Sequence, residues 1–362
     1  MSTRYFNSGR ELLPKEQFVQ LDFNLQLESG LELKQPTIAF QTWGKLNDDK
    51  SNVIWVCHAL TGNHLIHEWW SGLFGQDKCF DPANYFIVSV NVPGSCYGTT
   101  GPLSFKNSND RYFRSFPAIT IRDMVSVLDF VRIYLEIDSI HLLIGASLGG
   151  QQVLEWAIQQ PHLFQYLIPI ATNVKHSPFG IAFNEAQRLA LLADPTFEQD
   201  LFNGGKKGLI AARSIAMLSY RTYDGYQLTQ AETTADKSDD FKAASYQRYQ
   251  GEKLTNRFNA YSYWVLSKSM DSHNLERNRK PVEDLLAALT TPTLVVGIDS
   301  DLLFPLREQQ FIADQLPNAQ LATLTSDFGH DGFLVEFEQL TVEIQSFLDQ
   351  QADKKTTQVI YN

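Results

Sequence analysis

The sequence is poor in cysteine, with three residues in 362, at positions 57, 79 and 96. No two of them have the Cys-x-x-Cys spacing of a zinc or redox motif, and an odd number cannot all pair in disulfides. No stretch approaches the roughly 18 apolar residues that a membrane-spanning helix needs. Met1–Glu11 has no apolar signal segment. We therefore expect a cytoplasmic protein with reduced thiols and no membrane anchor.

Charged residues are also scarce, at 20% of the chain, against about 25% in typical soluble proteins. The 41 acidic residues outnumber the 30 basic ones, and the formal net charge is -11 at pH 7. An acidic surface argues against nucleic acid or an anionic membrane as partner, although a locally basic site for an anionic substrate remains possible. We find no cluster with metal-ligand spacing and no Gly-x-Gly-x-x-Gly after the first α/β strand. Neither a metal nor a dinucleotide is therefore expected.

The apolar pattern favours an α/β fold. Residues 18–27 alternate with a period close to two, and a turn at Gly30 and the segment 36–42 follow, which predicts an antiparallel hairpin. Later apolar runs do not alternate, which is typical of strands buried on both faces of a parallel sheet. Helical patterns at 121–135 and 150–160 lie between them, so we expect a mostly parallel sheet with helices on both faces. The runs are 53–57, 85–90, 140–145, 166–170, 293–297 and 320–324.

Residues 177–286 interrupt this alternation of strands and helices. The segment contains helical patterns at 184–193, 208–217 and 258–270, and it has no convincing strand. Residues 231–242 are polar and are expected to be exposed. The chain is therefore predicted to consist of an α/β core, formed by 1–176 and 287–362, with a helical cap inserted at 177–286.

A nucleophile motif lies at the end of one predicted strand. Residues 145–149 read Gly-Ala-Ser-Leu-Gly, which matches Gly-x-Ser-x-Gly between a strand and a helix. The serine must occupy a strained turn to project its hydroxyl, and flanking glycines avoid collisions there. The helix N-terminus can stabilise negative charge that develops on a substrate. The pattern predicts an α/β-hydrolase fold with Ser147 as the nucleophile.

A nucleophilic serine needs a base and an acid that orients the base. In this fold they follow the serine in the order acid, then histidine. Asp299 and Asp301 both follow the strand at 293–298, and we favour Asp301 because the next residues, Leu-Leu-Phe-Pro, resemble the usual turn after the acid. His330 follows the last strand, beside a glycine, and is the predicted base.

The predicted oxyanion hole needs two backbone N–H donors. Leu148 directly follows the nucleophile and would supply one of them. Leu60 lies in the loop 58–62 after an early strand and would supply the other. His58, at the start of this loop, is expected to have a structural role.

Several segments together resemble the homoserine O-acetyltransferase family, from Tyr5 to about Leu348. The most specific are Cys-Tyr-Gly-Thr-Thr-Gly-Pro at 96–102 and Thr-Ile-Arg-Asp-Met-Val at 120–125. The resemblance implies a ping-pong transfer of acetyl from acetyl-CoA, a co-substrate, to the hydroxyl of L-homoserine in methionine biosynthesis. It implies no cofactor and a homodimer formed through the cap. The remaining segments are 58–62, 91–95, 116–119, 145–150, 300–305 and 329–331.

The family pattern also assigns a clamp for the amino-acid substrate. Arg213 would bind the carboxylate of homoserine, and Asp331 would bind its ammonium group; the alternatives are a salt bridge within the cap and a turn-stabilising carboxylate. The elbow reads Gly-Ala-Ser-Leu-Gly-Gly-Gln at 145–151, where family members commonly read Gly-Gly-Ser-Met-Gly-Gly-Met. This departure leaves the predicted triad intact. Succinyl-CoA as donor, serine as acceptor, and a plain esterase therefore stay open as alternatives.

Overall fold

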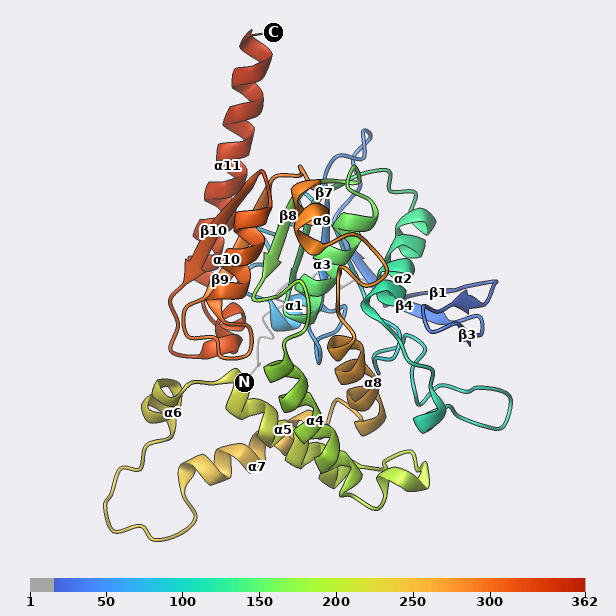
Figure 1. The fold of residues 1–362 in the computed structure, drawn as a ribbon, viewed down its shortest axis with the longest axis vertical. Coiled ribbons are helices and arrows are strands. Elements are labelled where there is room, and N and C mark those ends of the chain that lie inside the picture. Colours follow the sequence, from blue (N-terminus) through green and yellow to red (C-terminus); the bar gives the residue numbers. More distant parts are fainter. Residues whose placement is uncertain (1–15, 362) are drawn as a thin grey trace, which may run out of the picture.

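A mostly parallel sheet forms the centre of the protein, whose computed structural model describes residues 16–361. The expectation for Met1–Glu11 lies outside these residues. The eight strands follow the order β1-β4-β6-β5-β7-β8-β9-β10 (Figure 1). Strand β4 is antiparallel to β1 and β6, and the other neighbouring pairs are parallel. The predicted α/β class is confirmed. The strands are β1 Gln17–Gln20, β4 Thr37–Trp43, β5 Val53–Cys57, β6 Phe86–Val90, β7 Ile140–Ala146, β8 Phe164–Ile170, β9 Thr293–Ile298 and β10 Ala319–Leu324.

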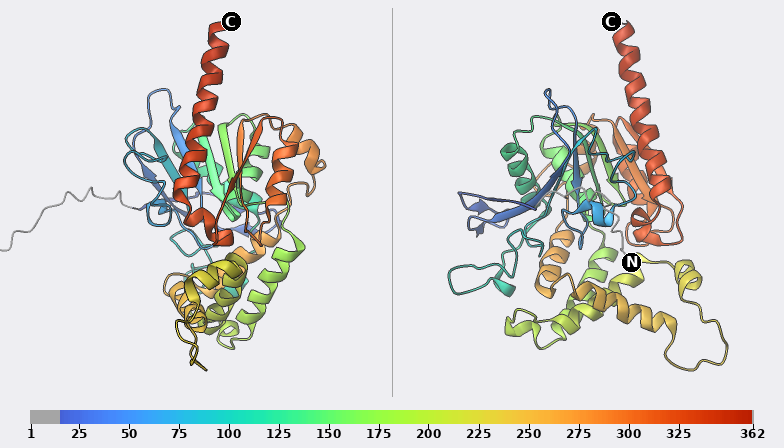
Figure 2. Two further views of the ribbon diagram at one scale, coloured as in Figure 1. Left: turned by 90° about the vertical axis from the view of Figure 1, so that its left-hand side faces the viewer. Right: turned by 180° about the vertical axis from the view of Figure 1, so that it is seen from behind.

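Alternate residues of the parallel strands pack into two apolar clusters on opposite faces of the sheet. Trp55 and Leu143 belong to one cluster, and Val56 and Ile144 belong to the other. This explains why the predicted strands are apolar without alternation. Helices α2 (Ile121–Tyr134), α3 (Leu148–Gln159), α9 (Val282–Ala287) and α10 (Leu306–Gln315) cover the first face, and α1 (Ile66–Trp69) and α11 (Phe337–Tyr361) cover the second (Figure 2). No helix within residues 16–361 combines the length and apolarity needed to cross a bilayer.

The predicted N-terminal hairpin is only partly correct. Strand β1 does pair with β4. The expected continuation of β1 to residue 27 instead turns away and forms a separate small hairpin, β2 (Leu25–Gln26) with β3 (Glu32–Leu33). Gly30 has φ of 80° between them, a conformation that glycine adopts without strain. The alternating residues 18–27 therefore belong to two different sheets: β1 to the large sheet and β2 to the small hairpin.

A group of helices lies beyond the carboxyl ends of the parallel strands, below the sheet in Figure 1. Helix α7 was not predicted because only Gly251 and Leu254 are buried along it, which leaves almost no apolar periodicity. An isolated β-bridge joins Lys175, just before α4, to Asn274, just after α8, so the chain enters and leaves this group of helices at the same place. The division into core and cap at 177–286 remains a proposal. The helices are α4 Pro178–Leu192, α5 Lys206–Tyr220, α6 Tyr223–Gln230, α7 Lys242–Thr255 and α8 Ala260–Asp271.

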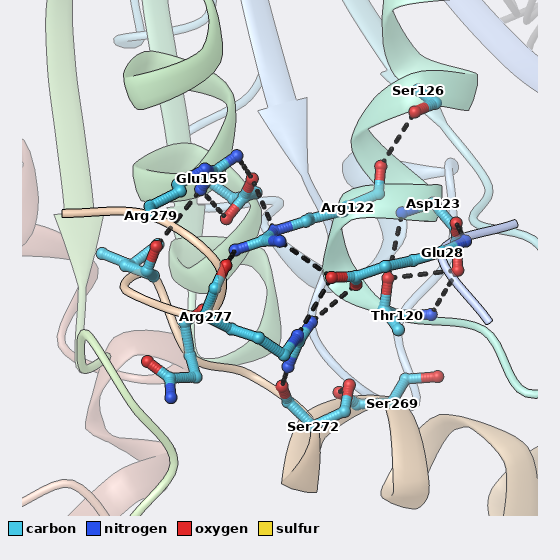
Figure 3. Close-up of polar contacts among 12 residues, drawn as sticks. Glu28, Thr120, Arg122, Asp123, Ser126, Glu155, Ser269, Ser272, Arg277 and Arg279 are labelled. Carbon is cyan, nitrogen blue, oxygen red and sulfur yellow. Dashed lines mark hydrogen bonds and ion pairs between the residues drawn. The ribbon is translucent and has the colours of Figure 1, made fainter.

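An ion-pair network joins the segment after α8 to the core (Figure 3). The carboxylate of Glu155, on α3, lies 2.6 Å from Arg279 and 3.5 Å from Arg122, on α2. Glu28 lies 2.8 Å from Arg122 and 2.6 Å from Arg277. The Glu155 side chain is only 2% exposed, so its charge depends on these two arginines rather than on water.

We expect Glu155→Ala to lower the free energy of unfolding by about 3 kcal/mol, the lower end for a broken buried ion pair, because Arg279 loses its carboxylate partner and Arg122 keeps only Glu28. The measurement is denaturant-induced unfolding. Asp138→Ala is a matched control: Asp138 also pairs with a cation, Lys50, but its side chain is 80% exposed, and loss of such a pair costs about 0–1 kcal/mol. Equal losses in the two variants would show that the network contributes no more to stability than an exposed ion pair.

Candidate active site

Ser147 lies on a sharp turn between β7 and α3. Its φ is 57° and its ψ is -121°, and the residue is only 4% exposed. A Cβ atom at Gly145 would lie 2.6 Å from the backbone of Gly149, and one at Gly149 would lie 2.2 Å from the carbonyl oxygen of Cys57. Both positions therefore need glycine, as the motif predicted, and Ser147 adopts a strained backbone conformation of the kind that clusters at functional sites.

Hydrogen bonds from neighbouring elements hold this turn. The N–H of Ser147 donates to the carbonyl of Ile170 at the end of β8, at 2.9 Å. The hydroxyl of Thr172 donates to the carbonyl of Ser147 at 3.0 Å, and the side-chain amide of Gln309, on α10, donates to the carbonyl of Thr172 at 2.5 Å. The helix that follows the predicted acid thus also supports the nucleophile.

His330 and Asp301 form a buried pair. Nδ1 of His330 donates to Oδ2 of Asp301 at 2.6 Å. The second oxygen of Asp301 accepts the N–H groups of Leu303 and Phe304 at 2.8 and 2.9 Å. Asp299 instead accepts the N–H of Ser326 at 3.2 Å. The structure therefore pairs the histidine with Asp301, the acid that we favoured.

Aromatic side chains fix the His330 ring. It stacks on Phe304, with centroids 5.0 Å apart, and meets Phe333 edge-on at 5.4 Å. With Nδ1 bonded to Asp301, Nε2 has no hydrogen-bond partner within the described part of the chain. No hydrogen bond joins Ser147 and His330 there either, and such bonds are often loose until substrate binds. A ring held this way can accept a proton at Nε2.

One predicted oxyanion donor, Leu148, lies on the elbow itself, and the other lies on the loop after β5, where the carbonyl of His58 accepts from the side chain of Gln152 on α3 at 3.3 Å. Leu148 is the first residue of α3, so its N–H has no acceptor within the helix. The loop with Leu60 is held by His58, whose Nδ1 donates to Ala59 at 2.9 Å and whose Nε2 accepts the N–H of Val92 at 3.1 Å. Burial lowers the pKa of His58 to about 4, so the ring stays neutral and keeps both bonds. This is the structural role that the sequence indicated.

The ring of Tyr220 lies between Arg213 and His330. Its guanidinium carbon lies 5.2 Å from the ring centroid of Tyr220, and that ring lies 5.7 Å from His330. Among the side chains of residues 16–354, which the structure describes, Arg213 forms no ion pair with a carboxylate. The alternative of a salt bridge within the cap is therefore not seen.

Asp331 has a partner that the sequence did not indicate. Its Oδ2 lies 2.9 Å from Nε of Arg221, directly after α5. The guanidinium of Arg221 also lies 4.9 Å from the ring of Phe328. Oδ1 of Asp331 has no hydrogen bond among the described residues, so the carboxylate retains one oxygen for another donor. In the sequence, this ion pair was indicated only by the position of Arg221 at the end of a helix, α5.

A buried polar chain beside the elbow was also missed. Gln151 Nε2 donates to Asn173 Oδ1 at 3.2 Å, and Asn173 Nδ2 donates to Glu308 Oε2 at 3.0 Å. Burial raises the pKa of Glu308 to about 7, and the negative charge of Asp301 adds to the shift. Gln151, where the family pattern commonly has methionine, was the signal that could have indicated this chain.

Comparisons with known proteins agree with this architecture. Residues 52–337 match the family model described as alpha/beta hydrolase fold. A curated homoserine O-acetyltransferase from Cyclobacterium marinum is 48% identical over 324 residues, which covers 89% of this chain and 92% of that protein. A solved homoserine O-acetyltransferase from Staphylococcus aureus has a TM-score of 0.78 at 29% identity, covering 92% and 95% of the two chains.

Esterase E22 has a TM-score of 0.83 at 20% identity, covering 92% of this chain and 99% of its own, and this likeness shows the fold alone. The fold and the elbow thus define a protein of the α/β-hydrolase class. Within that class, the chain belongs to the homoserine O-acetyltransferase family. Its role is that of an acyltransferase.

We expect Asp301→Asn to lower the rate of acylation about 10,000-fold, because an amide favours the wrong tautomer of His330. Asp299→Asn should change it little, since its oxygen can still accept from Ser326. The measurement is the burst of p-nitrophenol from p-nitrophenyl acetate, with circular dichroism to check folding. A larger loss in Asp299→Asn would mean that Asp299 is the acid.

We expect Glu308→Gln to stabilise the protein above pH 7 but not below pH 4.5. The folded carboxyl, with a pKa of about 7, stays protonated where the unfolded one, with 4.5, has already ionised. The stability contributed by Glu308 therefore falls as pH rises through that window, and glutamine removes this loss while its oxygen still accepts from Asn173. Unfolding of both proteins at pH 4.5 and 8.5 measures the difference. The same difference at both pH values would contradict the shifted pKa.

Proposed function

We propose that the protein transfers an acetyl group from acetyl-CoA to the hydroxyl of L-homoserine by a ping-pong mechanism. The observation that supports the proposal is the guanidinium of Arg213, which forms no ion pair among the described side chains and is separated from His330 by the ring of Tyr220. An amino-acid acceptor needs such a cation for its carboxylate. Acetyl-CoA acts as a co-substrate, and the proposed reaction needs no resident cofactor or metal.

In the first half-reaction Ser147 attacks the thioester carbonyl while Nε2 of His330 takes the hydroxyl proton. The carbonyl oxygen becomes an oxyanion, which accepts the N–H groups of Leu60 and Leu148. The C–S bond then breaks, and the thiolate of CoA takes the proton from His330. Asp301 stabilises the imidazolium throughout. The product is acetyl-Ser147.

In the second half-reaction the hydroxyl of homoserine attacks the acetyl group, and His330 takes its proton. When the tetrahedral intermediate collapses, that proton returns to the oxygen of Ser147. Arg213 binds the carboxylate of homoserine with paired hydrogen bonds. Oδ1 of Asp331 accepts from the ammonium group, while Oδ2 remains paired with Arg221.

The alternatives differ in what attacks the acyl-enzyme or in which donor forms it. Water at about 55 M competes with a dilute alcohol, so transfer depends on positioning worth several kcal/mol. An esterase for apolar esters has no use for Arg213 and Asp331 as a clamp, and these residues favour a transferase. Succinyl-CoA as donor and L-serine as acceptor would use the same chemistry.

The setting of the reaction is part of the proposal. O-acetyl-L-homoserine would serve methionine biosynthesis in the cytoplasm. We further propose a homodimer through the cap, where α4 exposes Phe179, Leu189 and Leu192. Exposed apolar groups of this kind are typical of protein interfaces.

The proposal is tested by following the release of free CoA from acetyl-CoA, with and without L-homoserine. Release that depends strongly on homoserine is expected, and succinyl-CoA and L-serine should be poorer substrates. Equally fast release without an acceptor would indicate a hydrolase. A preference for succinyl-CoA or serine would keep the mechanism and change the reaction. Ser147→Ala should abolish release.

We expect Arg213→Ala to raise the KM for homoserine about 10- to 100-fold, the loss typical of a charge-assisted hydrogen bond. The acylation burst with p-nitrophenyl acetate should stay unchanged, because that step involves no homoserine. Arg213→Lys keeps the charge but loses the paired geometry, so an intermediate KM is expected. An unchanged KM in Arg213→Ala would remove the residue from the clamp.

A further inference from the structure

A separate cavity lies at the seam between the core and the cap helices. It has a volume of about 490 Å³, within the range of roughly 300–1,000 Å³ that is usual for ligand pockets. One wall is the loop after β6, and the other walls are residues 202–203 and 255–262. In Figures 1 and 2 this loop lies beside the cap, and Arg114 joins them through an ion pair with Asp200 at 3.1 Å.

The cavity is positively charged in an acidic protein. Arg111 and Arg257 line it, and no lining residue in the described part of the chain is a carboxylate. Arg111 donates to the carbonyl of Leu103, and Arg257 donates to the carbonyl of Thr61 and the hydroxyl of Tyr97. These partners are neutral, so neither guanidinium charge is compensated locally. With a net charge of -11 on the chain, such a cavity favours an anionic ligand.

Two exposed aromatic rings flank Arg111. Its guanidinium carbon lies 4.1 Å from the ring centroid of Phe105 and 5.3 Å from that of Phe202. The two residues are 58% and 57% exposed, which is high for such apolar groups. Exposed rings next to an arginine can stack a base while the guanidinium pairs with a phosphate. This combination suits a phosphorylated nucleotide better than a simple anion.

One wall of the cavity contacts a loop of the candidate active site. Nη1 of Arg257 lies 2.5 Å from the carbonyl oxygen of Thr61, the residue after Leu60. A ligand in contact with Arg257 therefore lies next to the loop that supplies a proposed oxyanion donor. Acyl-CoA could occupy both places, because it carries a phosphorylated nucleotide at one end and, at the end of a long pantetheine arm, a reactive thioester.

We propose that this cavity binds the 3′-phosphorylated ADP end of the acyl-CoA donor. Arg111 contacts a phosphate, Phe105 and Phe202 hold the adenine, and the pantetheine arm passes Arg257 toward Ser147. The assignment rests on acyl-CoA being the donor, as proposed above. It makes Arg111 a residue for binding the donor rather than for chemistry.

The test compares acetyl-CoA with S-acetyl-N-acetylcysteamine, a thioester that lacks the nucleotide. Arg111→Ala should raise the KM for acetyl-CoA at least about tenfold and leave the KM for the short thioester unchanged. Adenosine 3′,5′-bisphosphate should inhibit the wild type competitively against acetyl-CoA and should inhibit Arg111→Ala much more weakly. Arg248→Ala is the matched control, because Arg248 is an exposed arginine on α7 that is paired with Asp240.

Each contrary outcome has a distinct meaning. An unchanged KM for acetyl-CoA in Arg111→Ala overturns the assignment of the cavity and leaves the proposed function in place. An equal rise for both thioesters also overturns it, since Arg111 would then act by shaping the loop. If the wild type accepts the short thioester but not acetyl-CoA, the proposed donor is wrong, and the assignment is wrong with it.

Discussion

The close approach of α3 to the end of β5 is the constraint on which the candidate site depends. Gly149 lies against the carbonyl of Cys57 without room for a side chain. At this close approach the turn at Ser147 has a positive φ, and α3 begins at the next residue. Thr172 and Gln309 hold the turn from the other side. The strain at one residue is thus maintained by packing from three other elements.

The core and the helical segment supply different parts of the proposed chemistry. Ser147 and the Asp301–His330 pair come from loops at the carboxyl ends of the strands, where α/β sheets usually bind ligands. The arginines come from the helical segment: Arg213 lies over Tyr220, and Arg221 pairs with Asp331. Because Asp331 compensates the charge of Arg221, Arg213 is the cation of this segment that would attract a carboxylate to the proposed site. This division explains how a fold shared with esterases can serve transfer to an amino acid.

Elements whose residues repeat a strong local pattern were predictable. The parallel strands were found because both faces are apolar, and the elbow was found because glycine spacing follows from steric limits. The prediction of the N-terminal hairpin was partly wrong because an alternating apolar pattern does not determine which strand each part of the segment pairs with. Helix α7 was missed because it buries so little. Glu308 and Arg221 were missed because their partners, Asn173 and Asp331, are more than a hundred residues distant in sequence.

The sequence by itself determined the α/β class, the chain order of the residues proposed as nucleophile, acid and base, and the need for glycine around Ser147. These depend on local sterics and on periodicity, which neighbouring residues establish between them. Only the tertiary structure decided that His330 bonds to Asp301 rather than Asp299, and that Asp331 is already paired with Arg221. The physical reason is that hydrogen bonds and ion pairs act over about 3 Å. Which groups come that close is decided by how distant segments pack.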